Sequence, residues 1–369
     1  MTLTCRAAVL HQSGTPLSIE RVTLAPPSPT DVVVKVRAAG LCHTDLEVID
    51  GSLRYPLPMI LGHEAAGVVE QVGSAVRDVR IGDHVILSWN PHCGHCFQCD
   101  RAQPILCETY LARGLEGVHF DGTSKAQLAG GGGLAHLMFL GAFSEYVVLP
   151  AQQAIVVPKE IPFDRACLIG CGVMTGVGAA LNVAEICHGD TVMITGCGAV
   201  GLAAVQGARL AGAGAIIAVD LDDAKLALAR QLGATHDVNA AREDPVQIAK
   251  AATRGRGADV ILEAAGHPLA FRQTAEAVRP GGEVIWLGKI DVTQDVSFRW
   301  GALMGEKRFR RSSYGGARPR RDFPLLAQAY LDGRLKLDEL ITGRCSLDGI
   351  NDGFEALRRG RSIRTVVEF

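Results

Sequence analysis

The stretch TVMITGCGAVG, residues 191–201, decides the fold of this chain of 369 residues. Its first five residues are mostly apolar and β-branched, which is typical of a strand buried in a sheet. The pattern G-x-G-x-x-G follows at once, and a helical pattern then runs to about Ala211. A second apolar strand is expected at 215–220. A strand, a glycine turn, a helix and a strand in this order predict a βαβ unit within a parallel sheet.

Three glycines and one carboxylate in this unit predict a dinucleotide site. Gly196 permits the tight turn, Gly198 lets the backbone approach a pyrophosphate, and Gly201 lets the helix pack closely on the strand. The helix N-terminus offers unpaired N–H groups to the phosphates. Asp220, nineteen residues after Gly201, is placed to bind the adenosine ribose hydroxyls. Residues 221–223 follow with no arginine to meet a 2′-phosphate, so the sequence favours NAD over NADP. A glycine turn in a domain without nucleotide is the alternative.

Strands and helices continue to alternate through residues 173–313. Further helices are expected at 224–232 and 269–278, and further strands at 259–262 and 283–287. Near 314 the chain leaves this pattern, and helices at 322–332 and 348–359 and a strand at 364–368 follow. We therefore predict one doubly wound coenzyme domain at 173–313, with the remaining segments, 1–172 and 314–369, forming the other domain.

The part before 173 has the spacing of a barrel-like all-β unit. Strands are expected at 6–10, 31–36, 67–73, 82–86 and 142–148. Residues 112–142, which include four consecutive glycines, are expected to form a loose surface excursion. A helix is expected from Asp164, with Asp164 as its N-cap, to the glycines at 170 and 172.

Composition excludes several classes of protein. The net charge is −2 and 48% of the residues are hydrophobic, so nothing favours a nucleic acid or an anionic membrane as a partner. The start, MTLTCRAAVL, lacks the pattern of a secretory signal, and Gln206 and Arg209 interrupt the most apolar region. Eleven cysteines without a signal indicate a reducing compartment, so we expect a cytoplasmic protein.

Four cysteines are spaced as metal ligands: Cys93, Cys96, Cys99 and Cys107. Four thiolates satisfy the tetrahedral coordination of zinc and leave no position open, so the pattern predicts a structural zinc site. A disulfide pair is the alternative, although disulfides are uncommon in the cytosol.

A second candidate metal site begins with Cys42 and His63. Each lies near a carboxylate, Asp45 or Glu64, that could orient it. The spacing leaves Cys167 and Cys171 as alternatives for a third ligand.

Taken in order, these motifs resemble the zinc-dependent medium-chain alcohol dehydrogenases over nearly the whole chain. The resemblance implies an α/β protein with a GroES-like β-barrel catalytic domain and a Rossmann coenzyme domain. It implies two zinc ions per chain, and it selects Cys42, His63 and Cys171 as ligands of the catalytic one. It also implies NAD as coenzyme and a hydride transfer between NAD and an alcohol.

The resemblance assigns roles to further residues. Thr44 takes the alcohol's proton, Asp45 orients His63, and Glu64 lies close to the zinc. The residues expected to bind the coenzyme are His43, Thr175, Gly196, Gly198, Val200, Gly201, Asp220, Lys225 and Arg364. Glu47 departs from the family, because many members end their proton relay with a histidine at this position.

Four positions resemble the lining of the substrate channel: Leu53, Trp89, Leu137 and Met138. Their apolar character predicts a primary aliphatic, allylic or aromatic alcohol or aldehyde as the small-molecule substrate. Leu53 argues against the glutathione-dependent formaldehyde dehydrogenases, which carry an acidic residue there. A dehydrogenase for another thiol adduct of formaldehyde and a non-catalytic zinc and NAD-binding redox sensor are the alternatives. The long segment 112–142 resembles the dimeric branch, so a homodimer is expected and a tetramer is the alternative.

Overall fold

The computed structural model describes residues 3–369 and contains two compact units. Residues 1–171 and 318–369 form the first, and residues 172–317 form the second. The boundaries predicted from the sequence lie within a few residues of these.

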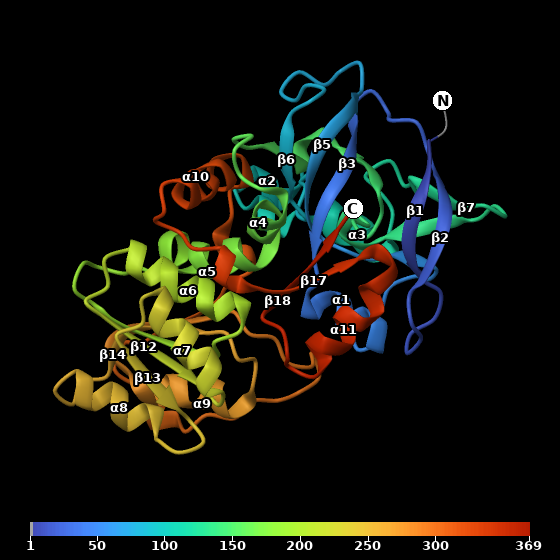
Figure 1. Ribbon diagram of the computed structural model, residues 1–369. Helices are drawn as coiled ribbons and strands as arrows, with labels where there is room; N and C mark the ends of the chain where they lie inside the picture. Colours follow the sequence, from blue (N-terminus) through green and yellow to red (C-terminus); the bar gives the residue numbers. More distant parts are fainter. Residues whose placement is uncertain (1–2) are drawn as a thin grey trace. The chain divides into compact units, whose positions relative to one another are not determined.

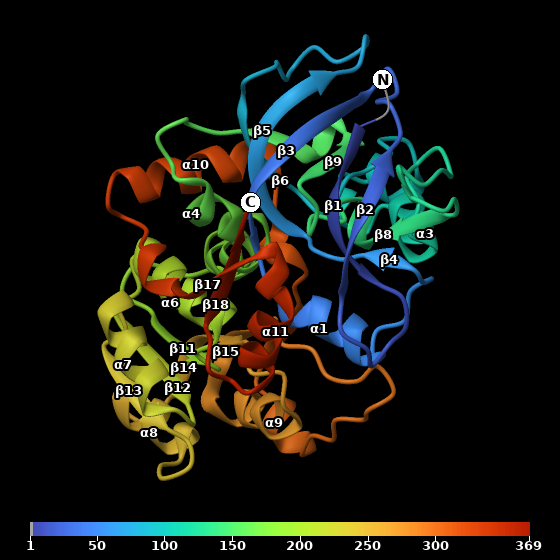
Figure 2. The ribbon, with the colours of Figure 1, turned by 45° about the vertical axis from the view of Figure 1, so that its right-hand side comes forward.

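The first unit contains a closed barrel and a larger sheet (Figures 1 and 2). The barrel follows the order β1 (Leu3–Leu10), β2 (Ser18–Leu24), β7 (Ala126–Leu128), β8 (Gly133–His136) and β4 (Met59–Ile60). The sheet follows the order β10 (Ala154–Val156), β6 (His84–Leu87), β5 (Glu64–Val72), β3 (Asp31–Gly40), β18 (Arg364–Glu368) and β17 (Ile341–Ser346), and β9 (Tyr146–Pro150) also pairs with β3. The helices of this unit are α1 (His43–Asp50), α2 (Phe97–Asp100), α3 (Glu108–Glu116), α4 (Phe163–Leu168), α10 (Pro319–Leu331) and α11 (Ile350–Arg358).

Strand β3 organises the larger sheet. It pairs antiparallel with β5, β9 and β18, and Figure 2 shows β3 and β5 side by side. Its sequence, DVVVKVRAAG, is apolar almost throughout rather than alternating, and most of its residues are buried. A continuous apolar run of this length is typical of a strand covered on both faces. Val32, Val34 and Val36 of β3 belong to the main hydrophobic core of this unit. The chain reaches Cys42 two residues after the end of β3.

The segment 112–142 is ordered, and the predicted loose excursion is wrong. Strands β7 and β8 lie in it and help to close the barrel. The glycine run forms the hairpin turn between them, with positive φ angles at Gly131 and Gly132 that favour glycine. Phe139 and Leu137 are fully buried after the hairpin. Strands of three and four residues carry too little periodicity to be recognised in a sequence.

The helix near 164 also differs from expectation. It begins at Phe163 after Pro162, so Asp164 lies in the first turn, where it pairs with Arg165 and Arg344 instead of capping. The helical stretch continues past the glycines through the π-helical turns Ile169–Val173 and Ala179–Val183. The whole stretch, Phe163–Val183, is long and apolar enough to cross a membrane by length and composition alone. However, 72% of its apolar window is buried inside the protein, as in a core helix.

The second unit is a parallel sheet with helices (Figure 1). Its strands follow the order β13 (His236–Asn239), β12 (Ala215–Asp220), β11 (Thr191–Thr195), β14 (Ala258–Glu263), β15 (Val278–Trp286) and β16 (Arg308–Arg311). Its helices are α5 (Met174–Gly178), α6 (Ala199–Leu210), α7 (Asp223–Leu232), α8 (Pro245–Ala252) and α9 (Pro268–Ala277). The order reverses at β11, which is the switch point at which doubly wound sheets bind ligands.

The turn between β11 and α6 depends on its glycines. Gly196 has a φ of 86°, in the left-handed region. A Cβ at Gly201 would overlap the carbonyl oxygen of Gly196, whereas a Cβ at Gly198 would meet no atom within 4 Å. Gly196 therefore permits the tight turn, Gly198 leaves open space above the turn, and Gly201 allows the helix to pack closely. The sequence pattern predicts these three roles.

We expect Gly201→Ala to destabilise the protein and Gly198→Ala to leave its thermal stability unchanged. The first substitution forces the backbone apart and should cost about 2 kcal/mol or more, lowering the melting temperature by roughly 5 °C. Differential scanning calorimetry of the two variants measures this. Equal melting temperatures for Gly201→Ala and the wild type would contradict the packing seen here.

Candidate metal and coenzyme sites

Cys42 lies at the junction of β3 and α1. Its backbone is extended, with φ −128° and ψ 154°, and α1 starts at the next residue. The side chain of Asp45, in the first turn of α1, accepts a hydrogen bond from the backbone N–H of Cys42 at 3.3 Å. Gly51, with a φ of 82°, ends the helix in the left-handed conformation. Local backbone chemistry thus fixes the thiol of Cys42, which is 8% exposed.

Asp45 also fixes the imidazole of His63. Its Oδ1 lies 3.2 Å from Nδ1 of His63 and accepts a hydrogen bond from the N–H of Gly62 at 2.9 Å. Both Asp45 and His63 are buried. The other ring nitrogen, Nε2, is buried and has no hydrogen-bond partner. A buried unpaired nitrogen is costly, and a metal ion is a partner that would satisfy it.

Cys171 completes this group. It lies in the turn Ile169–Val173, which packs closely on β6 because Gly170 lacks a side chain: a Cβ there would lie 3.0 Å from the carbonyl oxygen of Leu87. The ligand atoms of Cys42, His63, Glu64 and Cys171 all lie within 4.8 Å of one another. Cys167, the alternative third ligand, is fully buried and directs its thiol to the carbonyl oxygen of Asp164 at 3.3 Å.

The thiols of Cys42 and Cys171 shift each other's pKa in opposite directions. Hydrogen bonding with Cys171 lowers the pKa of Cys42 well below the usual value, and the same interaction raises the pKa of Cys171. Burial alone would lower the pKa of His63, but Asp45 and Cys42 outweigh it and raise that pKa. A divalent cation would displace the protons from these three ligands.

Glu64 is fully buried beside the thiols. Gly40 gives it room, because a Cβ at Gly40 would lie 2.7 Å from Oε2 of Glu64. Nη2 of Arg364 lies 3.2 Å from Oε1, a charge attraction without an aligned hydrogen bond, and Nη1 donates to the carbonyl oxygen of Leu41 at 3.2 Å. Burial raises the pKa of Glu64 to about 8 despite this arginine. The ion pair places Arg364 next to Glu64, a contact that the sequence does not predict.

The remaining predicted residues of the first unit fall into two groups. His43, Thr44 and Glu47 lie on α1, with His43 exposed and the other two half-buried. Of the predicted channel residues, Leu137 lies fully buried in the core, and Leu53, Trp89 and Met138 pack against that core with part of their surface exposed. Their role in binding substrate stays a prediction.

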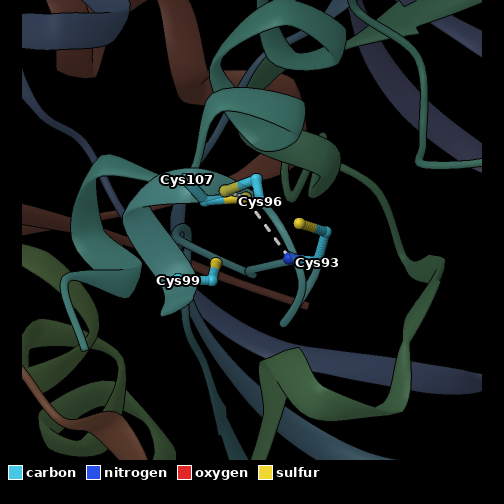
Figure 3. A group of neighbouring side chains, drawn as sticks. All are labelled: Cys93, Cys96, Cys99 and Cys107. Atoms are coloured by element: carbon cyan, nitrogen blue, oxygen red, sulfur yellow. Dashed lines mark hydrogen bonds between the residues drawn. The ribbon is translucent and has the colours of Figure 1, made fainter. Parts of the chain in front are cut away.

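The sulfur atoms of the predicted structural site, in Cys93, Cys96, Cys99 and Cys107, lie close together (Figure 3). Cys107 caps α3, where its sulfur accepts hydrogen bonds from the N–H groups of Tyr110 at 3.4 Å and Cys93 at 3.2 Å. The sulfurs of Cys96 and Cys107 are 4.0 Å apart. That separation is too long for a disulfide and close to the ~3.8 Å expected between two thiolates on one tetrahedral zinc.

These two donor sets fit zinc. Four thiolates close the coordination shell, as in a structural site. Two thiolates and one imidazole leave a position open, as a catalytic site requires. Glu64 lies within reach of the second set, next to the ligands, where the family resemblance placed it.

In the second unit, Asp220 ends β12 beside the glycine turn. Its Oδ2 accepts from the N–H of Cys197 at 2.6 Å, and its Oδ1 accepts from the N–H groups of Leu221 and Asp222. The open space over Gly198, which a Cβ would enter without contact, fits a pyrophosphate at the N-terminus of α6. Of the other predicted coenzyme residues, Val200 lies in α6, Lys225 in α7 and Thr175 in α5.

One charged group near this loop is not predicted from the sequence. Arg242 forms two hydrogen bonds with Asp223, nineteen residues earlier in the chain. No arginine directly follows Asp220 in the sequence, yet the fold brings Arg242 close to this loop.

Comparison with known proteins agrees with this geometry. Residues 28–159 match the alcohol dehydrogenase GroES-like domain, and residues 199–331 match the zinc-binding dehydrogenase domain. The S-(hydroxymethyl)glutathione dehydrogenase of Paracoccus denitrificans is 38% identical, over 98% of this chain and 99% of the relative. The protein of the same name from Aspergillus oryzae is 40% identical, over 98% of this chain and 95% of the relative. The crystal structure of benzyl alcohol dehydrogenase from Acinetobacter calcoaceticus superimposes with a TM-score of 0.94 at 31% identity, covering 100% of this chain and 99% of that chain.

The fold and the two cysteine-containing clusters define a two-domain α/β oxidoreductase of the zinc-binding class. The chain belongs to the zinc-dependent medium-chain alcohol dehydrogenase family. The family resemblance and the fold class inferred from the sequence are confirmed.

We expect Asp45→Asn to weaken zinc binding by the first cluster about 10- to 100-fold, because His63 loses the carboxylate that orients it. Competition with a chromogenic chelator measures the affinity. Asp50→Asn is the matched control, because Asp50 is on the same helix but is exposed and paired with Arg358. Unchanged zinc affinity in Asp45→Asn would contradict the orienting role.

Proposed function

We propose that the protein is an NAD-dependent dehydrogenase that oxidises a hydroxymethyl carbon, with an S-hydroxymethyl thiol adduct of formaldehyde as the substrate ranked first. The observation that carries the enzymatic part is the cluster of Cys42, His63 and Cys171, in which the buried Nε2 of His63 has no hydrogen-bond partner. The names of the relatives from Paracoccus denitrificans and Aspergillus oryzae support the substrate. They favour this substrate over the simple primary alcohol expected from the sequence.

In the proposed reaction, RS–CH2OH loses a hydride to NAD and a proton to the protein, and gives the thioester RS–CHO. Zinc, when bound, would lower the pKa of the substrate hydroxyl and polarise the product carbonyl. Thr44 takes the hydroxyl proton while it passes its own hydroxyl proton on toward Glu47 or solvent. The guanidinium of Arg364, 3.2 Å from the buried Glu64, adds positive charge beside the ligands. Asp45 keeps His63 in one tautomer by binding Nδ1. In the second unit, Asp220 binds the adenosine ribose, and the amides at the start of α6 bind the pyrophosphate.

A second substrate class is an apolar primary alcohol. Leu53, Trp89 and Met138 offer apolar surface, and the matched structure from Acinetobacter calcoaceticus is a benzyl alcohol dehydrogenase. Leu53 also implies that a thiol carrier is not held by an acidic group at that position. The non-catalytic redox sensor ranks below both, because the ligand set and Thr44 are intact. All eleven cysteines are free, which supports a cytoplasmic enzyme.

A substrate panel tests the proposal directly. We expect NADH formation from formaldehyde plus a low-molecular-weight thiol to exceed that from benzyl alcohol or hexanol in kcat/KM by at least about tenfold, a difference of about 1.4 kcal/mol. Glutathione and other thiols should be compared, with formaldehyde alone as the control. A higher kcat/KM for benzyl alcohol or hexanol than for the thiol adduct would identify an apolar alcohol as the substrate. No turnover with any of these substrates would favour the non-catalytic redox sensor.

Glu47 tests the proton relay. If Glu47 passes protons in place of the family's histidine, Glu47→Gln should lower the rate by up to about a hundredfold and alter the pH–rate profile. The wild-type profile should lack the step near pH 6.5 that an ordinary histidine gives. Glu70→Gln, an exposed residue of β5, is the control. An unchanged rate and profile in Glu47→Gln would mean that Glu47 has no relay role.

We also propose a homodimer formed through the second unit. One stretch of this unit exposes large apolar side chains: Val292 is 100% exposed, Trp300 77% and Met304 60%. Exposed apolar groups of this size indicate an interaction surface. Trp300→Glu should yield monomers in light scattering at micromolar concentration, whereas Leu325→Glu, an exposed leucine of α10, should stay dimeric. A wild-type tetramer or a dimeric Trp300→Glu would overturn this proposal.

A further inference from the structure

The ion pair between Asp223 and Arg242 joins the first residue of α7 to the loop after β13. Nη2 of Arg242 donates to Oδ1 of Asp223 at 2.7 Å, and Nη1 donates to Oδ2 at 3.0 Å. The amide of Asn239 donates to the same Oδ1 at 2.8 Å. Both oxygens of Asp223 are therefore engaged, and two nitrogens of the guanidinium face a carboxylate.

This pair lies close to the carboxylate proposed to bind ribose. Asp220 and Asn239 are partners across strands β12 and β13, and the N–H of Ala240 donates to the carbonyl oxygen of Asp220 at 3.0 Å. The amide of Asn239 also donates to the carbonyl oxygen of Leu221 at 3.1 Å, which ties the loop after β12 to the end of β13. Arg242 is thus two residues beyond a backbone group bonded to Asp220.

Open space adjoins Arg242. A cavity of about 570 Å³ is bounded by residues 240–246, by α9 and by Arg299. Arg299 is paired with Glu276 at 2.6 Å, so its charge is compensated as well. The cavity therefore has room for an anionic group. Of the three arginines that line it, Arg242 and Arg299 have carboxylate partners, and the third is Arg272.

The difference between NAD and NADP is a phosphate on the ribose 2′-oxygen. A phosphate is bound best by a guanidinium that can present two parallel N–H groups. Asp223 occupies that face of Arg242. Asp220 itself has both oxygens engaged with backbone N–H groups and presents negative charge to the ribose.

We propose that Asp223 is a specificity-determining residue that excludes NADP, because it holds the guanidinium of Arg242 and neutralises its charge beside the adenosine ribose. The inference rests on the proposed NAD-dependent function. The competing explanation is a surface ion pair without a role, since both side chains are 63% exposed and exposed pairs contribute little to stability.

Binding measurements at low ionic strength separate these explanations. The probes are 2′,5′-ADP against 5′-AMP, by calorimetry, and NADPH against NADH, by fluorescence. The variants are Asp223→Asn, Asp223→Ala and the double variant Asp223→Ala with Arg242→Gln. Asp237→Asn is the matched control, because it removes another exposed, arginine-paired carboxylate of the same unit.

We expect Asp223→Asn and Asp223→Ala to bind 2′,5′-ADP and NADPH on the order of three- to tenfold more tightly than the wild type. Affinity for 5′-AMP and NADH should change less than about twofold. The double variant should lose the gain, and Asp237→Asn should show none. If the ion pair had no role, removal of Asp223 would not produce a gain in 2′,5′-ADP or NADPH affinity that depends on Arg242.

Five results would overturn the inference. Wild-type binding of NADH with no gain in either Asp223 variant would overturn it and leave the proposed function intact. An equal gain in Asp237→Asn, or a gain that survives Arg242→Gln, would show a general charge effect. A wild type that prefers NADPH, or that binds neither coenzyme, would overturn the proposed coenzyme and this inference together.

Discussion

The contact between Asp45 and Nδ1 of His63 is the interaction on which the first unit's chemistry depends. It directs Nε2 toward the thiols of Cys42 and Cys171 and leaves that nitrogen without a hydrogen-bond partner. Such a group is unfavourable in a protein interior unless a cation joins it. The surrounding structure is consistent with this demand: the start of α1 fixes Cys42, Gly40 makes room for Glu64, and Gly170 lets the turn that carries Cys171 approach β6.

The second unit obeys a different constraint. Its sheet order reverses at β11, and the turn after such a reversal is the position at which doubly wound sheets bind their ligands. The glycines at 196 and 201 are required by the protein itself, because one has a positive φ angle and the other touches the backbone of the first. At Gly198 a Cβ atom would meet no protein atom within 4 Å, so the protein's own packing does not require a glycine there. The space above Gly198 is therefore the best place for a coenzyme phosphate.

Sequence patterns predict the elements that are bounded by clear turn signals or that consist of long apolar runs. Strands β11, β12 and β18 have the expected bounds, because glycine turns or buried β-branched runs define them. The strands that are not predicted from the sequence are β2, β4, β7, β8, β10, β13, β16 and β17. Strands β7 and β8 are very short, and the sequence of β16, RFRR, is typical of a charged loop although it forms the edge of the sheet. Charged edges of this kind protect a sheet from pairing with other chains.

The candidate metal ligands are recognisable in the sequence because chemistry restricts such ligands to few residue types. The pairs Glu64–Arg364 and Asp223–Arg242 are not, because they join positions 300 and nineteen residues apart whose contact only the tertiary structure reveals. The same limit applies to the substrate. Leu53 favours an apolar alcohol, whereas the named relatives favour a thiol adduct, and no local pattern decides between them.

Metal analysis of the purified protein tests the central claim most directly. The account predicts two zinc ions per chain in the wild type, about one in Cys171→Ser and about one in Cys99→Ser, with turnover lost in Cys171→Ser. A wild-type protein with one zinc, or a Cys171→Ser variant that keeps two and turns over normally, would contradict it.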